Sequence, residues 1–213
     1  MTGVQTCALP ILKNILDLGC GDGQWSLALA KKAGVKQIYG IEIIDEQIKK
    51  AKKNIKVIKS DLNADFPFED NSFDLIHANQ VIEHIADLDH FVKEIYRVLR
   101  KGGYAIISTE NQCSWHNIMA MILGWQMFSL TNVSNKQTGI GNPLALHRGE
   151  SGTFASSSWT HKTIMSLKGL KELFAIHNFR EITAKGAGYY PLPSNFGNLD
   201  KNHSHFITIR AFK

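Results

Sequence analysis

The sequence predicts an α/β protein in which helices cover both faces of a mostly parallel sheet. Two observations predict this fold class. First, short apolar segments alternate with helical segments between Lys13 and Thr109, as expected when parallel strands are joined by crossover helices. Second, the chain has 213 residues, of which 44% are hydrophobic and 20% are charged, which is enough for one domain with a substantial core.

Strands and helices are predicted in strict alternation at the start of the chain. The segment 14–18 is apolar and ends in glycines, which is typical of a buried parallel strand. The segment 45–54 has an acidic start and a basic end, which suit the dipole of a helix. Strands are predicted over 14–18, 37–44, 55–59, 73–78 and 104–109. Helices are predicted over 24–33, over 45–54, and from residue 85 to the glycines at 102 and 103.

Beyond Thr109 the alternation stops. Residues 110–158 contain an apolar segment, NIMAMILGWQMFSL, and then a stretch rich in glycine, serine and asparagine. The apolar segment is shorter than the roughly 18 residues that a membrane span needs. It predicts a helix packed on the domain, which would also serve as a cap over a substrate pocket. A helix over 167–177 and strands over 180–187 and 204–212 complete a domain that we place at 12–213.

The composition limits which kinds of partner and which cellular compartment we expect. A net charge of +5 and a pI near 9.1 permit an acidic partner without requiring one. The three cysteines have neither the even number of a disulfide framework nor metal-ligand spacing, which favours a reducing, cytoplasmic location. No membrane span is predicted, and the sequence leaves the oligomeric state open.

The first residues have a different origin from the rest. Residues 1–11, MTGVQTCALPI, resemble the translation of a sequencing-adapter oligonucleotide read from a GTG start, and they lack the basic region of a signal peptide. We expect this segment to be non-native and to pack on nothing specific. We also expect the natural protein to be longer at its N-terminus.

A glycine-rich turn follows the first predicted strand directly. Glycines at this place, Gly19, Gly21 and Gly23, let the backbone approach a ligand that a Cβ atom would push away. A dinucleotide site favours the pattern G-x-G-x-x-G, but here the third glycine comes one residue early, and Gln24 stands where that pattern has glycine. Asp17 comes two residues before the first glycine. The spacing therefore disfavours NAD as the cofactor.

Polar residues end the next predicted strands. Glu42 lies about 20 residues past the turn, where an acidic side chain can accept hydrogen bonds from both ribose hydroxyls. After the third strand, the Asp61 carboxylate could accept from an adenine amino group, and a backbone N–H there could donate to the ring. Asn79 and Gln80 follow the fourth strand.

These motifs together resemble those of class I S-adenosylmethionine-dependent methyltransferases. The resemblance rests on ILDLGCGDG, IYGIE, SDLNADFPFEDNSFDLIHANQVIEHI and EIYRVLRKGGYAIIST, and it extends more weakly through HKTIMSLKGLKELFAIHNF. The chain is most similar to the branch that contains quinone-biosynthesis and other small-molecule enzymes. The resemblance implies a Rossmann-like, doubly wound, mostly parallel seven-stranded sheet. Its last strand would be antiparallel, with an insert after the fifth strand.

The resemblance also implies S-adenosylmethionine as the cofactor and assigns the residues that hold it. The methionine portion would contact Asp17, Gly19, Gly21 and Gly23. The remaining contacts would come from Glu42 to the ribose, Asp61 and Leu62 to the adenine, and Asn79 and Gln80 beside the sulfonium. Cys20 would be a packing residue rather than a nucleophile.

The implied reaction is methyl transfer to a small-molecule acceptor. We expect it to be O- or C-directed, and the apolar insert suggests a hydrophobic acceptor. The candidate bases are Glu83, His84 and His161, with a packing role as the alternative for His84. Enzymes resembling quinone O-methyltransferases hold a divalent metal with such a Glu-His pair and an earlier Glu. This chain has Gln80 at the earlier place, so we expect no metal.

Three other functions remain open. A nucleic-acid methyltransferase is favoured by the pI and by the lysines at 49, 50, 52 and 53, but the Pro-Pro-aromatic signature of enzymes that methylate base amino groups is absent. Lysines on a flanking helix are more typical of a solvated face. A dehydrogenase is disfavoured by the glycine spacing. The last alternative is a truncated fragment that binds the cofactor but is inactive.

Overall fold

The computed structural model describes residues 12–150, 159–189 and 192–213. The predicted non-native segment 1–11 lies outside these residues, as do positions 151–158 of the predicted cap. No helix in the described ranges is long and apolar enough to cross a membrane.

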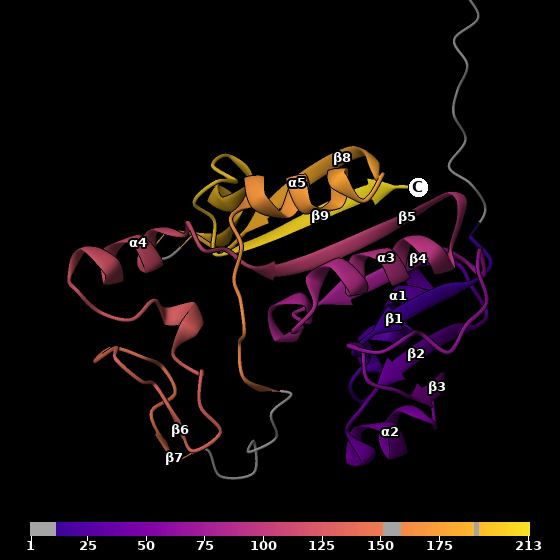
Figure 1. Ribbon diagram of the computed structural model, residues 1–213, viewed down its shortest axis with the longest axis horizontal. Helices are drawn as coiled ribbons and strands as arrows, with labels where there is room; N and C mark the ends of the chain where they lie inside the picture. Colours follow the sequence, from indigo (N-terminus) through magenta and orange to yellow (C-terminus); the bar gives the residue numbers. More distant parts are fainter. Residues whose placement is uncertain (1–11, 151–158, 190–191) are drawn as a thin grey trace, which may run out of the picture.

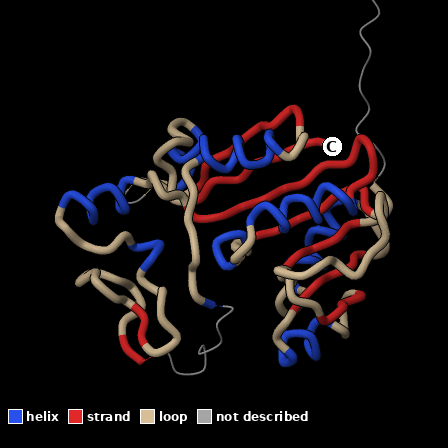
Figure 2. Tube along the Cα trace, viewed as in Figure 1, coloured by secondary structure: helices blue, strands red, loops and turns tan. Residues whose placement is uncertain are grey.

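A seven-stranded sheet forms the centre of the molecule, in the order β3-β2-β1-β4-β5-β9-β8 (Figures 1 and 2). Its strands are β1 (Ile15–Leu18), β2 (Ile38–Glu42), β3 (Lys56–Lys59), β4 (Phe73–Asn79), β5 (Leu99–Glu110), β8 (Arg180–Ala187) and β9 (Phe206–Phe212). The first five strands pair in parallel, and β9 is antiparallel to both β5 and β8. The predicted doubly wound sheet with an antiparallel last strand is confirmed.

Helices cover both faces of this sheet, because alternate residues of each buried strand point to opposite faces. Helices α1 (Gln24–Ala33) and α2 (Asp45–Ala51) cover one face, and α3 (Leu88–Val98) and α5 (Leu167–Ile176) cover the other. The core on the first face includes Ile15, Ala30, Ile38, Ala51 and Leu75. The core on the second face includes Leu16, Ile76, Phe91, Ile95 and Phe174. The molecule therefore has two apolar cores separated by the sheet.

Helix α3 is shorter than predicted at both ends. The sequence predicted a start at residue 85, but a short 3-10 turn over Ile82–His84 comes first. The helix then begins after Asp87, whose side chain accepts a hydrogen bond from the N–H of His90 and so caps the first turn. At the other end β5 begins at Leu99, directly after the helix.

The glycines at 102 and 103 lie inside β5 and do not end a helix. The register of β5 against β4 shifts here, so the glycines form an irregularity in the strand. Gly102 has a φ of 79°, and a Cβ on Gly103 would lie 2.9 Å from the carbonyl oxygen of Asp74. These two positions need glycine for the geometry of the strand. The sequence prediction that they end a helix was wrong, because a pair of glycines has the same pattern in both cases.

The insert after β5 extends beyond the carboxyl end of that strand (Figure 1). It contains α4 (Trp115–Ile122), a 3-10 turn over Phe128–Leu130, and a small hairpin of β6 (Gln137–Thr138) and β7 (Gly149–Glu150). The predicted apolar helix is therefore interrupted, because Gly124 has a φ of 73° just after α4 ends. The hairpin was not predicted, since two-residue strands carry no usable periodicity.

Candidate active site

The predicted cofactor residues gather at one edge of the sheet. Strands β1, β2, β3, β4 and β5 are parallel, so their carboxyl ends share that edge. The connection changes direction between β1 and β4, which are neighbours in the sheet. Open α/β sheets bind ligands in the crevice outside such a reversal of strand order.

The three glycines of the turn differ in what surrounds them. All three have positive φ values, at 63° for Gly19, 54° for Gly21 and 79° for Gly23. A Cβ on Gly19 would lie 2.7 Å from Cγ2 of Val81, and one on Gly23 would lie 3.3 Å from Ala51. A Cβ on Gly21 would meet nothing within 4 Å. Two glycines are thus required by protein neighbours, and Gly21 alone faces space that a ligand could occupy.

Asp17 is buried in β1, and both of its carboxylate oxygens lie against protein groups. One carboxylate oxygen accepts a hydrogen bond from the hydroxyl of Ser26, and the other lies 2.8 Å from Nδ1 of His77. Ser26 is a buried residue of α1, so Asp17 holds the first helix against the sheet. Sequence reasoning missed His77, because its link to Asp17 depends on the pairing of β1 with β4.

Glu42 joins the end of β2 to the glycine turn. Its Oε2 accepts from the N–H of Gly21 at 2.9 Å, and its Oε1 accepts from the N–H groups of Ile43 and Ile44 at 2.8 and 2.9 Å. A carboxylate offers about four acceptor positions, so one stays available for a ligand hydroxyl. The side chain that was predicted to bind the ribose therefore also sets the shape of the turn.

The remaining predicted cofactor residues lie along the same edge. Asp61 is exposed, and its Oδ1 accepts two hydrogen bonds from Asn63, while Leu62 packs on the core. Asn79 is exposed at the end of β4. Gln80 follows with a φ of 55°, which is unusual for a residue with a side chain and is typical of functional sites.

Cys20 has the packing role that the sequence predicted. It is buried, and a Cβ on Gly40 of the neighbouring strand would lie 2.5 Å from its sulfur. Burial, with the carboxylates of Asp17 and Glu42 adding to it, raises the pKa of this thiol to about 12. A thiol with such a pKa is a poor nucleophile near neutral pH.

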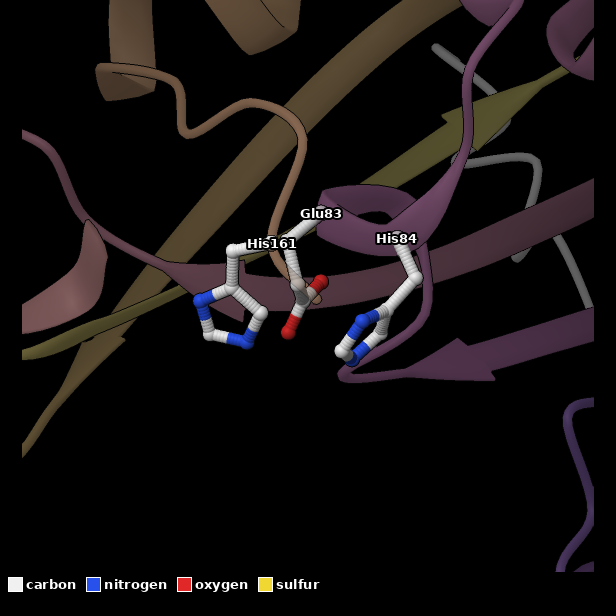
Figure 3. Close-up of side chains that lie close together, drawn as sticks. All are labelled: Glu83, His84 and His161. Atoms are coloured by element: carbon white, nitrogen blue, oxygen red, sulfur yellow. The ribbon is translucent and has the colours of Figure 1, made fainter. Parts of the chain in front are cut away.

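The three predicted catalytic residues meet beside this edge, although they come from two distant segments (Figure 3). Glu83 and His84 lie in the 3-10 turn after β4, and His161 lies in the chain that returns from the insert. Each offers one ligand atom, and these atoms lie within 4.8 Å of one another. The backbone N–H of Lys162 donates to the carbonyl of Glu83 at 2.7 Å, which holds the two segments together.

The Glu83 carboxyl is almost completely buried and only half satisfied. Its side chain is 1% exposed, and Oε2 accepts a hydrogen bond from the hydroxyl of Thr109 at 2.8 Å. Oε1 has no hydrogen-bond partner within the described residues. Burial raises the pKa of Glu83 to about 7, and the nearby Glu110 carboxylate adds to the rise. A carboxyl with such a pKa can both accept and donate a proton near neutral pH.

The two imidazole rings are held in one tautomer. Nδ1 of His84 lies 3.2 Å from the carbonyl of Thr160, and Nδ1 of His161 lies 2.6 Å from the carbonyl of Ser129. A carbonyl only accepts, so Nδ1 carries the proton, and Nε2 of each neutral ring keeps a lone pair. Burial, with the adjacent His161, lowers the pKa of His84 to about 4, so this ring is neutral at pH 7.

A second group of titratable side chains extends this cluster, and the sequence did not predict it. Oε2 of Glu110, at the end of β5, is buried without a hydrogen bond to any described residue and lies 4.0 Å from Nδ1 of His161. His116 and His205 pack with ring centroids 4.3 Å apart, and burial lowers the pKa of both. These residues come from β5, α4 and the start of β9, so only the tertiary fold brings them to this place.

This geometry suits proton transfer, and it could also hold a divalent cation. Two imidazole nitrogens and one carboxylate oxygen are a common ligand set, and second hydrogen bonds from Nδ1 to carbonyls often orient such ligands. The expectation of no metal rested on Gln80, and His161 now supplies a third donor in place of the missing glutamate.

Part of this sequence matches the model of a known protein family. The model of the methyltransferase domain family matches residues 16–107, which include the glycine turn, Glu42, Asp61 and the end of β4. Residues 16–107 are therefore similar to methyltransferase domains, and S-adenosylmethionine is the cofactor that this match and the similar structures support. The open space beside Gly21 and the free acceptor position of Glu42 are compatible with this cofactor.

The individual relatives agree on this class. Demethylmenaquinone methyltransferases of Staphylococcus aureus strains JH9 and Newman are 32% identical over 104 residues, which cover 46% of this chain and 43% of the relatives. The chain thus matches less than half the length of these relatives. A methyltransferase structure from Thermotoga maritima, a "possible histamine N-methyltransferase", has 21% identity and a TM-score of 0.64, covering 97% of this chain and 84% of that one. A phosphoethanolamine N-methyltransferase from Haemonchus contortus, solved with S-adenosylhomocysteine, has 15% identity and a TM-score of 0.61, covering 94% of this chain and 48% of that one.

Proposed function

We propose that this protein transfers a methyl group from S-adenosylmethionine to a small, hydrophobic acceptor of quinone-like character, at an oxygen or an activated carbon. The observation that carries the proposal is the cluster of Glu83, His84 and His161, whose carboxylate oxygen and ring nitrogens lie together beside the cofactor edge. The S. aureus relatives, named for a demethylated quinone, support this acceptor class.

The cofactor, when bound, supplies an electrophilic methyl group on a positively charged sulfur. The protein then has to orient the acceptor and remove its proton. A hydroxyl or an activated C–H next to the cluster would pass its proton to Nε2 of His84 or His161, or to Oε1 of Glu83. The raised pKa of Glu83 suits it to receive that proton near pH 7, since base strength is then matched to the working pH.

The experiment has a binding part and a turnover part. Calorimetry with S-adenosylhomocysteine should show binding, and NAD should show none. Replacing Glu42 by alanine should weaken that binding by about 1.5–3 kcal/mol, the scale of lost hydrogen bonds to a charged group. Mass spectrometry should then detect one added methyl group on a naphthohydroquinone acceptor. Binding of S-adenosylhomocysteine without turnover on hydroquinones, phenols or amines would support the inactive fragment instead.

A further inference from the structure

Helix α4 presents its apolar side to solvent. Trp115, Met119, Ile122 and Leu123 are exposed, and they follow the i, i+4, i+7, i+8 spacing that places residues on one side of a helix. In a helix that packs on its own domain, this stripe faces the core. Here it faces outward, and α4 lies at the end of the molecule farthest from α2 (Figure 1).

The side of α4 that faces the protein is polar. Asn117 is fully buried, and its side-chain amide donates to the carbonyl of Asn111 at 3.0 Å and to the hydroxyl of Ser129 at 2.9 Å. Its amide oxygen accepts from the N–H of Ser129 at 3.3 Å. Ala120 is the buried apolar residue of the helix. Hydrogen bonds therefore hold this side of α4 in place, and Met119, Ile122 and Leu123 of the stripe stay exposed in the described chain.

Ring contacts hold the first turn of the helix rigidly. The Trp115 ring stacks on His203 at 4.4 Å between centroids, and its Nε1 donates to the hydroxyl of Tyr189 at 2.7 Å. That hydroxyl donates in turn to Asp200 at 2.6 Å. The outward stripe is thus a fixed surface and not a fraying helix end.

Further exposed apolar side chains flank α4 on segments bonded to it. The N–H of Gln126, just beyond the helix, donates to the carbonyl of Gly141 at 2.9 Å, and the following loop exposes Leu144 and Leu146. Leu199 is exposed next to Asp200, in the turn that packs on Trp115. Grouped exposed apolar side chains of this size mark an interaction site.

The segment 111–149, which contains α4 and the loops after it, has two charged residues, Lys136 and Arg148, and both are basic, while the carboxylate of the neighbouring Asp200 is bonded to Tyr189 and His203. Between residues 111 and 171 the sequence contains a single acidic residue, Glu150, although the whole chain has 19. The same stretch holds five basic residues: Lys136, Arg148, Lys162, Lys168 and Lys171. Lys136, Arg148 and Lys162 are exposed. A basic surface with a protruding apolar stripe would repel a second copy of itself, but it suits an anionic partner.

We propose that α4 and its flanking loops dock on the surface of an anionic lipid bilayer, with the apolar stripe in the interface and the basic side chains at the headgroups. This arrangement is that of interfacial amphipathic helices, which lie on a membrane without crossing it. The proposal does not depend on the proposed acceptor, because it rests on the exposed surface alone.

Vesicle co-sedimentation of the full chain tests this surface. Vesicles of phosphatidylcholine with about a third phosphatidylglycerol should bind the protein, and vesicles of phosphatidylcholine alone should bind it much less. Ile122→Glu should lower the partition coefficient about tenfold or more, because a large apolar side chain can no longer enter the interface. Ile176→Glu is the matched control, since Ile176 on α5 is 72% exposed and Ile122 is 70% exposed. Arg148→Glu should weaken binding to the anionic vesicles, and Lys32→Glu on α1 should leave it unchanged.

Two further measurements keep the test decisive. Thermal melts should show that both isoleucine variants fold, since each side chain is exposed, and amide exchange of residues 115–123 should slow when anionic vesicles are added to the wild type. Absence of binding to anionic vesicles, or an equal loss in Ile176→Glu, would overturn the proposal. Sedimentation showing dimers that only Ile122→Glu dissolves, without vesicle binding, would assign the surface to a second copy instead. Methyl transfer to a water-soluble acceptor should stay unchanged in Ile122→Glu, which separates this test from that of the proposed function.

Discussion

The cofactor edge and the catalytic cluster lie on the same side of the sheet, yet their polar side chains are in opposite states. At the cofactor edge, both carboxylate oxygens of Asp17 and of Glu42 have hydrogen-bond partners within the protein. In the cluster, Oε1 of Glu83 and Oε2 of Glu110 are buried without hydrogen bonds from the part of the chain that the structure describes. A satisfied carboxylate shapes a site, whereas an unsatisfied buried one is costly and indicates a partner that binds or reacts there.

The largest expected effect is the loss of turnover when a histidine of the catalytic cluster is replaced. His84→Ala should lower kcat by about 10²–10⁴-fold, the usual contribution of a general base, and leave the Kd of S-adenosylhomocysteine nearly unchanged. His177→Ala is the control, because His177 is also buried but has both ring nitrogens within bonding distance of Leu173 and Asp89. The control should lose stability and keep its specific activity. The reverse pattern would show that His84 only packs.

The next effect concerns the pH dependence of stability. Glu83 has a pKa of about 7 in the fold against 4.5 ordinarily, so the folded state binds its proton more tightly than the unfolded state. The contribution of Glu83 to the free energy of unfolding should therefore fall by roughly 3 kcal/mol as the pH rises from about 4.5 to about 7. His84, with a pKa of about 4 against 6.5, acts in the opposite direction and loses stability as the pH falls through that range.

Glu83→Gln isolates the first of these contributions. Urea unfolding across that range, with chelator present, should show the variant gaining on the wild type as the pH rises. A difference between variant and wild type that does not change with pH would mean that Glu83 is hydrated and ionised like a surface carboxylate.

Two glycine substitutions should show which glycine of the turn supports the fold and which one lies against the cofactor. Gly19→Ala should destabilise the fold by about 2 kcal/mol more than Gly21→Ala, because its Cβ would overlap Val81 while both residues share a positive φ. Gly21→Ala should instead have the larger effect on cofactor affinity. Equal losses of affinity in both, measured by calorimetry, would show that the whole turn acts through its backbone shape.

The smallest effect concerns metal. Dialysis against a chelator should change turnover by no more than about twofold if the cluster acts through proton transfer. Loss of turnover that a divalent cation restores would instead make Glu83, His84 and His161 ligands, and would show that His161 replaces the glutamate absent at Gln80.

Sequence reasoning reached the fold and the cofactor edge because both are encoded locally. Strands β1, β2 and β4 are short, mostly apolar runs that end in a polar residue or are followed by a glycine, and that signal can be read without knowledge of contacts. The meeting of His161 with Glu83 was not predictable in the same way, since it depends on how the insert returns to the sheet. The outward stripe of α4 was missed for a related reason: an amphipathic pattern shows that a helix has two sides but not which side faces the protein.

The position of β9 between β5 and β8 bears on how the chain acquires its structure during synthesis. Strand β5 pairs with β4 soon after both emerge, but its other edge waits for β9, and Ser108 pairs with Thr208. Until β9 leaves the ribosome, β5 has a long edge of free N–H and C=O groups, which is a template for pairing with other nascent chains. Loss of the final strand by premature termination would therefore produce an aggregating protein rather than a smaller soluble one.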